Sequence, residues 1–216
     1  MTPNDPERGL ILAYAPAAGR PALAALFALD DALAALLRST TEPAIGMIRL
    51  AWWRERLAAL DVMPPPAEPV LRAIAAAVLP HGIRGADLGP IVDGWEALLD
   101  EPFDADAIAR YAEGRGKLFV LAGRAMGAAP SDPLAEAGQG WALADLARNV
   151  ETALPDLDAH TSLRHATAAR WSRNARALGA MAHLARLNLA APRDRPIPVG
   201  SPRRVARLLW HRLTGS

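Results

Sequence analysis

The residues best suited to chemistry in this sequence are carboxylates that interrupt apolar segments. Asp30 and Asp31 stand side by side within the run Ala-Ala-Leu-Phe-Ala-Leu-Asp-Asp-Ala-Leu. Asp has a low propensity for helix interiors, so two adjacent carboxylates there need a reason. Hard cations such as Mg²⁺ bind carboxylate oxygens and bridge to substrate phosphates, which makes a magnesium site one interpretation. The alternative is that Asp30 pairs with an arginine while Asp31 faces solvent.

A second polar cluster lies on a helical segment that is otherwise rich in alanine and leucine. It contains Asp145, Arg148, Asn149 and Glu151, and Asp145 and Asn149 are i, i+4 neighbours on one helix face. Sites in helical bundles are commonly lined by two facing helices. The two acidic clusters are therefore the candidate site.

Other kinds of site are not indicated. The sequence has no glycine-rich phosphate loop, no His-Glu-x-x-His pair and no nucleophile elbow. It also has no cysteine, which excludes a thiolate nucleophile, a disulfide scaffold and cysteine-ligated zinc.

Composition predicts the kind of element that positions these residues. The chain has 216 residues, of which 48 are alanine, and 51% of its residues are hydrophobic. Alanine is the strongest helix former and is depleted in strands, while a half-apolar composition argues against disorder. We therefore expect an all-α protein with a core of leucine and alanine.

Proline and glycine divide the chain into amphipathic segments with the 3–4 spacing of helix faces. The pattern predicts a single domain over residues 1–216, folded as a bundle of seven to nine helices. The predicted helices cover about 20–38, 44–61, 67–79, 86–100, 105–127, 133–153, 161–190 and 202–213.

Trp52 and Trp53 lie on the second of these segments. Trp53 falls on the same face as Leu50 and Leu57, so we expect it in the core. Trp52 is turned by about 100° from that face and could line a hydrophobic cavity or face a partner. Core packing is the alternative for this residue too.

Charge is distributed unevenly along the chain. Residues 1–159 hold 13 basic and 22 acidic residues, whereas residues 160–216 hold eleven arginines and one acid, Asp194. This Arg-rich C-terminal part could meet an anionic membrane surface, an acidic partner, or the acidic remainder of its own chain. Nucleic acid is not expected as a partner, because no recognition module accompanies the arginines.

The last predicted helix is basic and amphipathic. Val205, Leu208, Leu209 and Leu213 form its predicted apolar edge. The residues expected to contact a membrane or partner are Arg203, Arg204, Arg207, Trp210 and Arg212. Docking of this helix on its own bundle is the alternative.

No charge-free segment approaches the roughly 20 residues that a membrane span needs, and no basic n-region of a signal peptide precedes the first helix. The expected localisation is cytoplasmic, with peripheral contact at the inner membrane if the basic helix binds lipid.

The N-terminal third carries a resemblance to a known family. The matching elements are Ala15-Pro16, Arg20-Pro-Ala-Leu23, Ala25-Leu-Phe-Ala-Leu29, Glu42-Pro43 and Ile48-Arg-Leu-Ala-Trp-Trp-Arg54. They resemble the signature of the squalene/phytoene synthase family, most closely the branch that contains the mitochondrial complex I assembly factor and its bacterial relatives. The segments 111–127 and 141–150 are similar to that family's central Tyr-containing helix and its second acidic helix.

The resemblance implies an isoprenoid-synthase-type fold and a set of site residues. Active members hold magnesium and diphosphate with two Asp-rich motifs and join two prenyl diphosphates head to head. If this chain is active, the resemblance implies Mg²⁺ ligands at Asp30, Asp31 and Asp145. It implies substrate contacts at Arg20, Tyr111, Arg148 and Asn149.

The sequence departs from the family pattern within both motifs. Ala34, Ala35 and Ala153 stand where further Asp residues are usual, and Asn149 replaces an Asp. Loss of these charges weakens the stabilisation of a leaving diphosphate. The leading expectation is a non-catalytic or catalytically altered relative that acts as a binding or assembly protein, with a prenyl diphosphate, a lipid or a protein as its partner. The alternative is a Mg²⁺-dependent prenyl transferase of isoprenoid, carotenoid or hopanoid biosynthesis.

Overall fold

The computed structural model of the chain describes residues 6–149 and 154–216, and these residues form helices and no strands. Their ten α-helices are α1 (Pro6–Tyr14), α2 (Arg20–Arg38), α3 (Pro43–Ala59), α4 (Pro69–Ala77), α5 (Gly89–Glu96), α6 (Ala105–Met126), α7 (Leu134–Asn149), α8 (Leu154–Ala168), α9 (Arg176–Leu189) and α10 (Pro202–Thr214). Short 3₁₀ helices η1 (Leu79–His81), η2 (Gly85–Leu88), η3 (Ala97–Leu99) and η4 (Arg173–Ala175) connect several of them.

The helices begin and end where local chemistry favours it. Proline occupies the first turn of α2, α3, α4 and α10, where its missing N–H has no intrahelical partner to lose. Asp104 caps the start of α6 by accepting a hydrogen bond from the amide of Ala107 at 3.0 Å. The same helix ends at Gly127, whose φ of +70° is the left-handed conformation that glycine adopts without strain.

The all-α prediction is confirmed, with more helices in the described residues than the seven to nine expected. The N-terminal α1 was not predicted, and the segment predicted as one helix over 161–190 is divided into α8 and α9. Helix α8 ends at Ala168, and Trp171 lies just beyond it. The Trp171 amide donates to the carbonyl oxygen of Gly215 at 2.7 Å, and its indole Nε1 donates to that of Ala166 at 2.9 Å. Burial of this indole therefore ends the helix.

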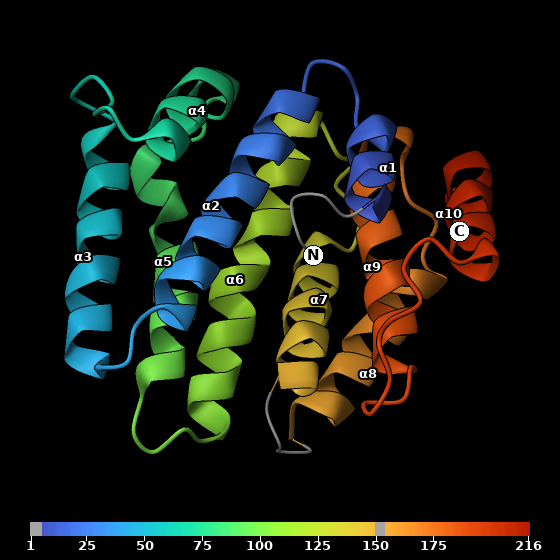
Figure 1. Cartoon of the computed structure of the whole chain (residues 1–216). Coiled ribbons are helices and arrows are strands. Elements are labelled where there is room, and N and C mark those ends of the chain that lie inside the picture. The colour runs from blue at the N-terminus through green and yellow to red at the C-terminus, as the bar shows by residue number, and fades with distance from the viewer. Residues whose placement is uncertain (1–5, 150–153) are drawn as a thin grey trace.

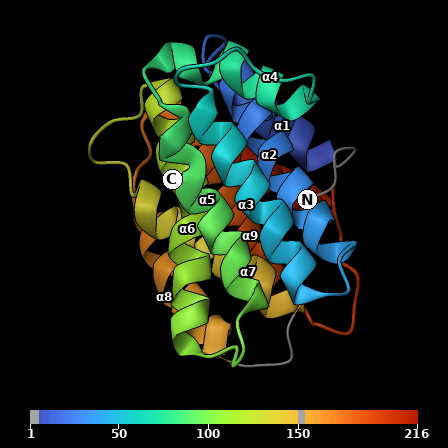
Figure 2. The ribbon, with the colours of Figure 1, turned by 90° about the vertical axis from the view of Figure 1, so that its left-hand side faces the viewer.

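Helix α6 lies between α5 and α7 and forms the centre of the bundle (Figure 1). Helix α2 crosses α6 on one side, and α3 forms the outer layer at one edge of the molecule (Figure 2). Helix α10 forms the opposite edge, where it packs on α9 (Figure 1). The two acidic motifs, on α2 and α7, therefore approach the central helix from different sides.

One cluster of buried apolar side chains runs from Ile11 of α1 to Leu208 of α10 and holds these helices together. Trp53 is part of it, as predicted. No helix among the described residues is long and apolar enough to span a membrane.

Candidate functional site

Glycine lets α6 come unusually close to the helices on both of its sides. A Cβ on Gly114 would lie 2.6 Å from the Cα of Gly94 on α5. A Cβ on Gly138 of α7 would lie 2.3 Å from the carbonyl oxygen of Gly116 on α6. Both distances are below van der Waals contact, so only glycine permits these approaches. The residue between the two α6 glycines is Arg115, which the close packing places within reach of both acidic motifs.

The Arg115 side chain joins the two acidic motifs directly. Its Nε and Nη2 donate to the two carboxylate oxygens of Asp30, each at 2.9 Å, in a bidentate pair. Its Nη1 donates to Oδ2 of Asp145 at 2.6 Å and to the hydroxyl oxygen of Tyr111 at 2.5 Å. Arg115 is 4% exposed and Asp30 is 6% exposed, whereas the Asp145 side chain is 40% exposed. The motifs therefore face each other as predicted, but a buried guanidinium lies between them.

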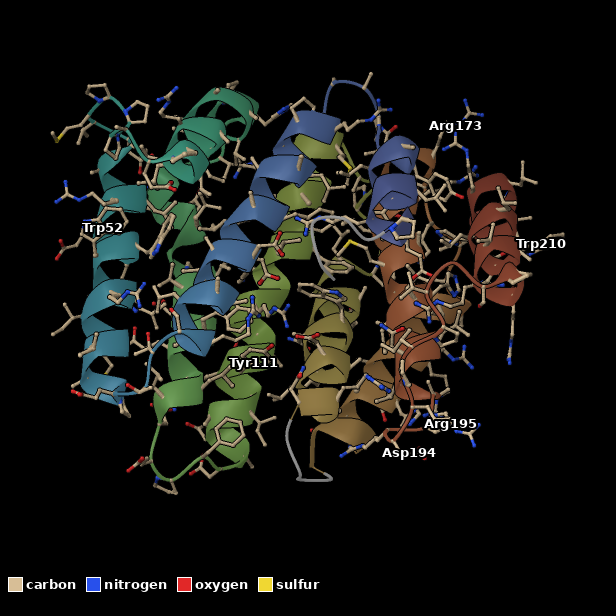
Figure 3. All side chains as sticks on the ribbon, viewed as in Figure 1. Trp52, Tyr111, Arg173, Asp194, Arg195 and Trp210 are labelled. Carbon is tan, nitrogen blue, oxygen red and sulfur yellow. The ribbon has the colours of Figure 1, made fainter. Side chains whose placement is uncertain are left out.

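Aromatic rings enclose the guanidinium. Its central carbon lies 4.2 Å from the ring centroid of Trp141 and 4.6 Å from that of Trp95, and Tyr111 is next to it at 5.7 Å. The indole Nε1 of Trp95 also donates to Oδ1 of Asp30 at 2.9 Å. Cation–π contacts of this kind are strongest where water is excluded, so the rings fix the position of the guanidinium. Figure 3 shows Tyr111 reaching from α6 into the middle of the bundle.

The electrostatics of the cluster favour its charged form. Burial raises the pKa of the Asp145 carboxyl, but the charge and hydrogen bond of Arg115 outweigh burial and hold that pKa below its usual value. Burial raises the pKa of the Tyr111 hydroxyl, so it stays protonated. For Arg115, burial disfavours the cation, yet the charges of Asp30 and Asp145 raise its pKa well above the usual value. Arg115 is therefore a permanent cation between the two carboxylates.

Asp31, the third predicted metal ligand, is also paired. Its Oδ2 accepts a hydrogen bond from Nη1 of Arg8 at 2.5 Å, and the Arg8 guanidinium stacks 4.7 Å from the ring centroid of Phe27. The alternative interpretation of the sequence, in which Asp30 pairs with an arginine, is therefore the arrangement observed. The same interpretation left Asp31 facing solvent, whereas in the structure Asp31 pairs with a second arginine, Arg8.

The donor set does not fit a magnesium ion. Mg²⁺ requires oxygen ligands that are free to bind it in octahedral geometry. Here Asp30 and Asp145 accept hydrogen bonds from Arg115, and Asp31 accepts one from Arg8. Within the residues that the structure describes, no group of three or more acidic or histidine side chains is arranged to hold a metal. Ala153 and Glu151 lie outside the described residues.

A groove of about 1190 Å³ opens beside the Arg115 cluster. Its polar lining comes from Arg8, Asp30, Asp31, Arg38, Tyr111, Arg115, Asp145 and Asn149. Its apolar walls come from Leu12, Ala24, Ala28, Ala32, Ala34, Ala35, Leu37, Trp95, Leu98, Leu99 and Leu146. Ala34 and Ala35 thus turn part of a motif that is acidic in active relatives into apolar wall.

The groove adjoins a second cavity at the α2–α3 edge. This cavity has a volume of about 660 Å³ and shares Ala32 and Ala35 with the groove. Its lining includes Ile48 and Trp52. Trp52 is 39% exposed, so it lines a cavity, one of its expected roles, and is not packed in the core.

The remaining predicted substrate contacts lie in different places. Asn149 lines the groove, and its Nδ2 donates to the carbonyl oxygen of Asp145 at 2.7 Å. Arg148 points the other way and donates to the carbonyl oxygens of Asn188, Ala191 and Arg195, which ties down the α9–α10 connection. Arg20 is outside the groove lining, where its Nε donates to the carbonyl oxygen of Leu12 at 2.8 Å. Arg20 and Arg148 therefore stabilise connections between helices.

The predicted membrane or partner contacts on α10 also divide into two groups. Arg204 lies in the interior, where its Nε and Nη2 donate to the two carboxylate oxygens of Glu7 at 2.6 and 2.7 Å. Arg207 is half-buried against His183. Arg203, Trp210 and Arg212 are exposed, and Arg212 also stacks 4.6 Å from the Tyr14 ring centroid. The structure thus assigns Arg204 to the bundle interior instead of the surface.

Sequence reasoning missed the residue at the centre of the site. Arg115 follows Tyr111 by four positions and therefore shares its helix face, which was the available signal. Glycines usually weaken a helix, but Gly114 and Gly116 on both sides of it allow the close helix contacts that surround it. Glu7 and Trp95 were missed because their partners are distant in sequence.

Comparison with known proteins agrees with this architecture. The model of the squalene/phytoene synthase family matches residues 2–191. No curated protein matches the chain significantly, and no solved structure does. The family match covers the two acidic motifs and the helix that carries Arg115.

Proposed function

Because the chain belongs to the squalene/phytoene synthase family, we propose that it is a non-catalytic or catalytically altered member acting as a binding or assembly protein. The observation that carries the proposal is the Arg115 guanidinium, which bridges Asp30 and Asp145 where an active member would hold cations. We place the chain in the branch of the complex I assembly factor and its bacterial relatives.

The charges of the acidic motifs are already balanced by arginines. Ionisation of a prenyl diphosphate requires positive charge that can stabilise the leaving diphosphate. In this chain the carboxylates that would bind Mg²⁺ are neutralised by Arg115 and Arg8, which are themselves held by stacking on aromatic rings. Expelling a buried guanidinium to admit a metal would leave it or its carboxylate partner unpaired, which costs several kcal/mol.

We expect the groove to bind an apolar ligand even without catalysis, because it is open and its walls are largely apolar. Its volume of about 1190 Å³ exceeds that of most small-molecule pockets. An isoprenoid, another lipid or an apolar protein segment would satisfy such walls. In the cell we expect the protein in the cytoplasm, with peripheral contact at the inner membrane.

The test is an incubation of purified protein with Mg²⁺ and farnesyl or geranylgeranyl diphosphate, followed by product extraction. We expect no head-to-head product, with a catalytically active family member as the positive control. Product formed at enzymatic rates would refute the proposal.

A second candidate is a Mg²⁺-dependent prenyl transferase with a reduced metal site. One observation favours it: Asp30, Asp31, Asp145 and Tyr111 all line a single groove whose remaining lining is mostly apolar. In that case the substitution Asp145→Ala would abolish turnover. It would not unfold the protein, because Asp145 is the most exposed of the three carboxylates.

A further inference from the structure

Helix α10 turns a polar face toward its own bundle. The residues that point inward are Arg204, Leu208 and His211, spaced i, i+4, i+7. Arg204 forms the bidentate pair with Glu7, and Nη1 of Arg204 donates to Oδ1 of Asn188 at 2.8 Å. The His211 ring packs 4.7 Å from that of His183 on α9. The helix is therefore anchored mostly by polar contacts that its sequence pattern did not suggest.

The face that α10 turns to solvent is apolar. Ala206, Leu209, Trp210 and Leu213 follow the i, i+3, i+4, i+7 spacing of one helix face, and we call them the outer stripe. Leu209 is 50% exposed, Trp210 57% and Leu213 77%. Figure 3 shows Trp210 on the side of α10 away from the bundle. This arrangement reverses that of an ordinary surface helix, which buries its apolar face.

Positive charge borders the outer stripe. Arg203 lies in the first turn of α10, next to Ala206 and Trp210 on the helix surface, and Arg173 lies beside one end of the helix (Figure 3). Both are exposed, and neither forms an ion pair with the described residues. Residues 160–216, which include α9 and α10, contain eleven arginines and a single acid. One of these arginines, Arg204, is paired with Glu7 in the interior.

We propose that the outer stripe of α10 is a membrane-binding face that lies flat on an anionic lipid surface. The helix of 13 residues is about 20 Å long and already folded, so it lies parallel to the surface without a disorder-to-order transition. Leu209, Trp210 and Leu213 insert among the lipid headgroups, where tryptophan is favoured, and Arg203 and Arg173 pair with lipid phosphates.

Charge distinguishes this face from the other exposed apolar stripe of the molecule. On α3, Ile45, Ile48 and Trp52 are exposed at the opposite edge (Figure 1). That stripe is bordered by two acidic residues, Glu42 and Glu55, and by two basic ones, Arg49 and Arg56, so its charges balance. The Arg56 guanidinium lies 6.0 Å from the ring centroid of Trp52. An anionic surface would repel those carboxylates, so it favours α10 over α3.

This proposal deepens the expected contact with a membrane and is independent of whether the groove is catalytic. It concerns the edge formed by α10, whereas the groove is lined by α1, α2, α5, α6 and α7. Loss of vesicle binding would therefore leave the conclusions about Arg115 unaffected, and the converse also holds.

The first experiment uses the absence of cysteine from the chain, which allows a single label. Leu213→Cys and the matched control Ile48→Cys, both at strongly exposed sites, carry an environment-sensitive fluorophore. With vesicles of phosphatidylcholine and phosphatidylglycerol we expect a blue shift and increased emission at position 213 and no change at 48. No change at 213, or a shift at 48 alone, would overturn the proposal.

The second experiment measures vesicle sedimentation of Leu209→Glu/Leu213→Glu and Arg203→Glu, with Ile48→Glu as control. All of these side chains are exposed, so the variants should fold, which circular dichroism checks. We expect at least about tenfold weaker binding for the double variant and at least about fivefold for Arg203→Glu, since each basic side chain at an anionic surface contributes about that factor. Binding should also fall as salt shortens the Debye length from about 10 Å to about 3 Å. Equal binding by the wild type and the double variant, or equal binding to pure phosphatidylcholine vesicles, would contradict the proposal.

Discussion

Replacing Arg115 by methionine should destabilise the protein severely. The side chain is 4% exposed and supplies the bidentate partner of Asp30, which is itself 6% exposed. Methionine keeps much of the volume and the contact with the rings of Trp95 and Trp141, but it removes the charge. After the change, Asp30 retains the hydrogen bond from Nε1 of Trp95 and loses its counter-ion.

The expected loss in the free energy of unfolding depends on whether Asp30 and Asp145 can be hydrated once Arg115 is removed. Breaking a buried ion pair by removing one partner costs about 3–5 kcal/mol. Asp30 contributes that full cost, whereas Asp145 adds little because its side chain is 40% exposed and can be hydrated. A domain of this kind is stable by only about 5–15 kcal/mol, so Arg115→Met removes at least about a fifth of the free energy of unfolding.

Urea unfolding followed by circular dichroism measures this loss. The double variant Asp30→Asn/Arg115→Met should recover at least about 2 kcal/mol, since the neutral amide no longer needs a counter-ion and still accepts from Trp95. Arg84→Met is the matched control: Arg84 is exposed and pairs with Asp87 at the surface, so its loss should leave the urea midpoint nearly unchanged.

The reasoning would be refuted if Arg115→Met unfolded within about 1 kcal/mol of the wild type. It would also be refuted if the Asp30→Asn change gave no recovery in the Arg115→Met background. If Arg115→Met does not fold at all, Arg115→Lys serves in its place, because it keeps the charge and loses the bidentate geometry.

Three further predictions concern other parts of the fold. Gly138→Ala should lower the free energy of unfolding by more than about 2 kcal/mol, because the new methyl group would lie 2.3 Å from a backbone oxygen of α6. Gly9 on α1 has open space around it, so Gly9→Ala should stabilise the protein by up to about 1 kcal/mol in the same urea assay. Burial lowers the pKa of His183 to about 3 and that of His211 to about 4, so near pH 5 both are neutral in the folded state and protonated in the unfolded state. Lowering the pH from 7 to 5 should therefore reduce the free energy of unfolding by up to about 4 kcal/mol. This pH dependence should flatten when both histidines are changed to Gln. Burial favours the neutral form of Glu7, but its hydrogen bonds with Arg204 and Gly200 outweigh burial and hold its pKa below the usual value. Glu7→Gln leaves Arg204 without a counter-ion, so it should cost about 3–5 kcal/mol at pH 7, measured by calorimetry. A loss under about 1 kcal/mol would show that the α1–α10 ion pair is unimportant.

The helices were largely predictable because alanine, proline and the apolar spacing agree locally. Proline at the start of a segment and glycine at its end act through the backbone of the same helix, as at Pro43 and Gly127. The break before Ser172 was not predictable in this way, since it depends on where the Trp171 indole is buried. The same limit explains the unexpected number of helices.

The candidate site was half predictable. Asp30 and Asp145 stood out because carboxylates in apolar helices are unusual, and the structure does bring them to one cluster. Their partner Arg115 did not stand out, because arginine is common on helix surfaces and nothing local shows that Gly114 and Gly116 bury it. Pairing across 85 and 30 positions is a property of tertiary packing alone.

Helix α10 shows a different failure of local patterns. Its sequence has an apolar edge, and the usual rule would bury that edge. Only Leu208 of the predicted edge is fully buried, because Glu7 on α1 offers a buried partner to Arg204 and thereby decides which face turns inward. The counter-ion lies 197 positions away, so the sequence pattern of the helix could not reveal it.

If Arg115 holds the two acidic motifs in place of Mg²⁺, the protein should have no Mg²⁺ site between them. Calorimetric titration of Mg²⁺ into the protein, in the presence of a non-hydrolysable farnesyl diphosphate analogue, tests this most directly. We expect no saturable Mg²⁺-dependent binding. Saturable binding of Mg²⁺ that is lost in Asp30→Asn and Asp145→Asn would contradict it, since those carboxylates would then be metal ligands and not partners of the guanidinium.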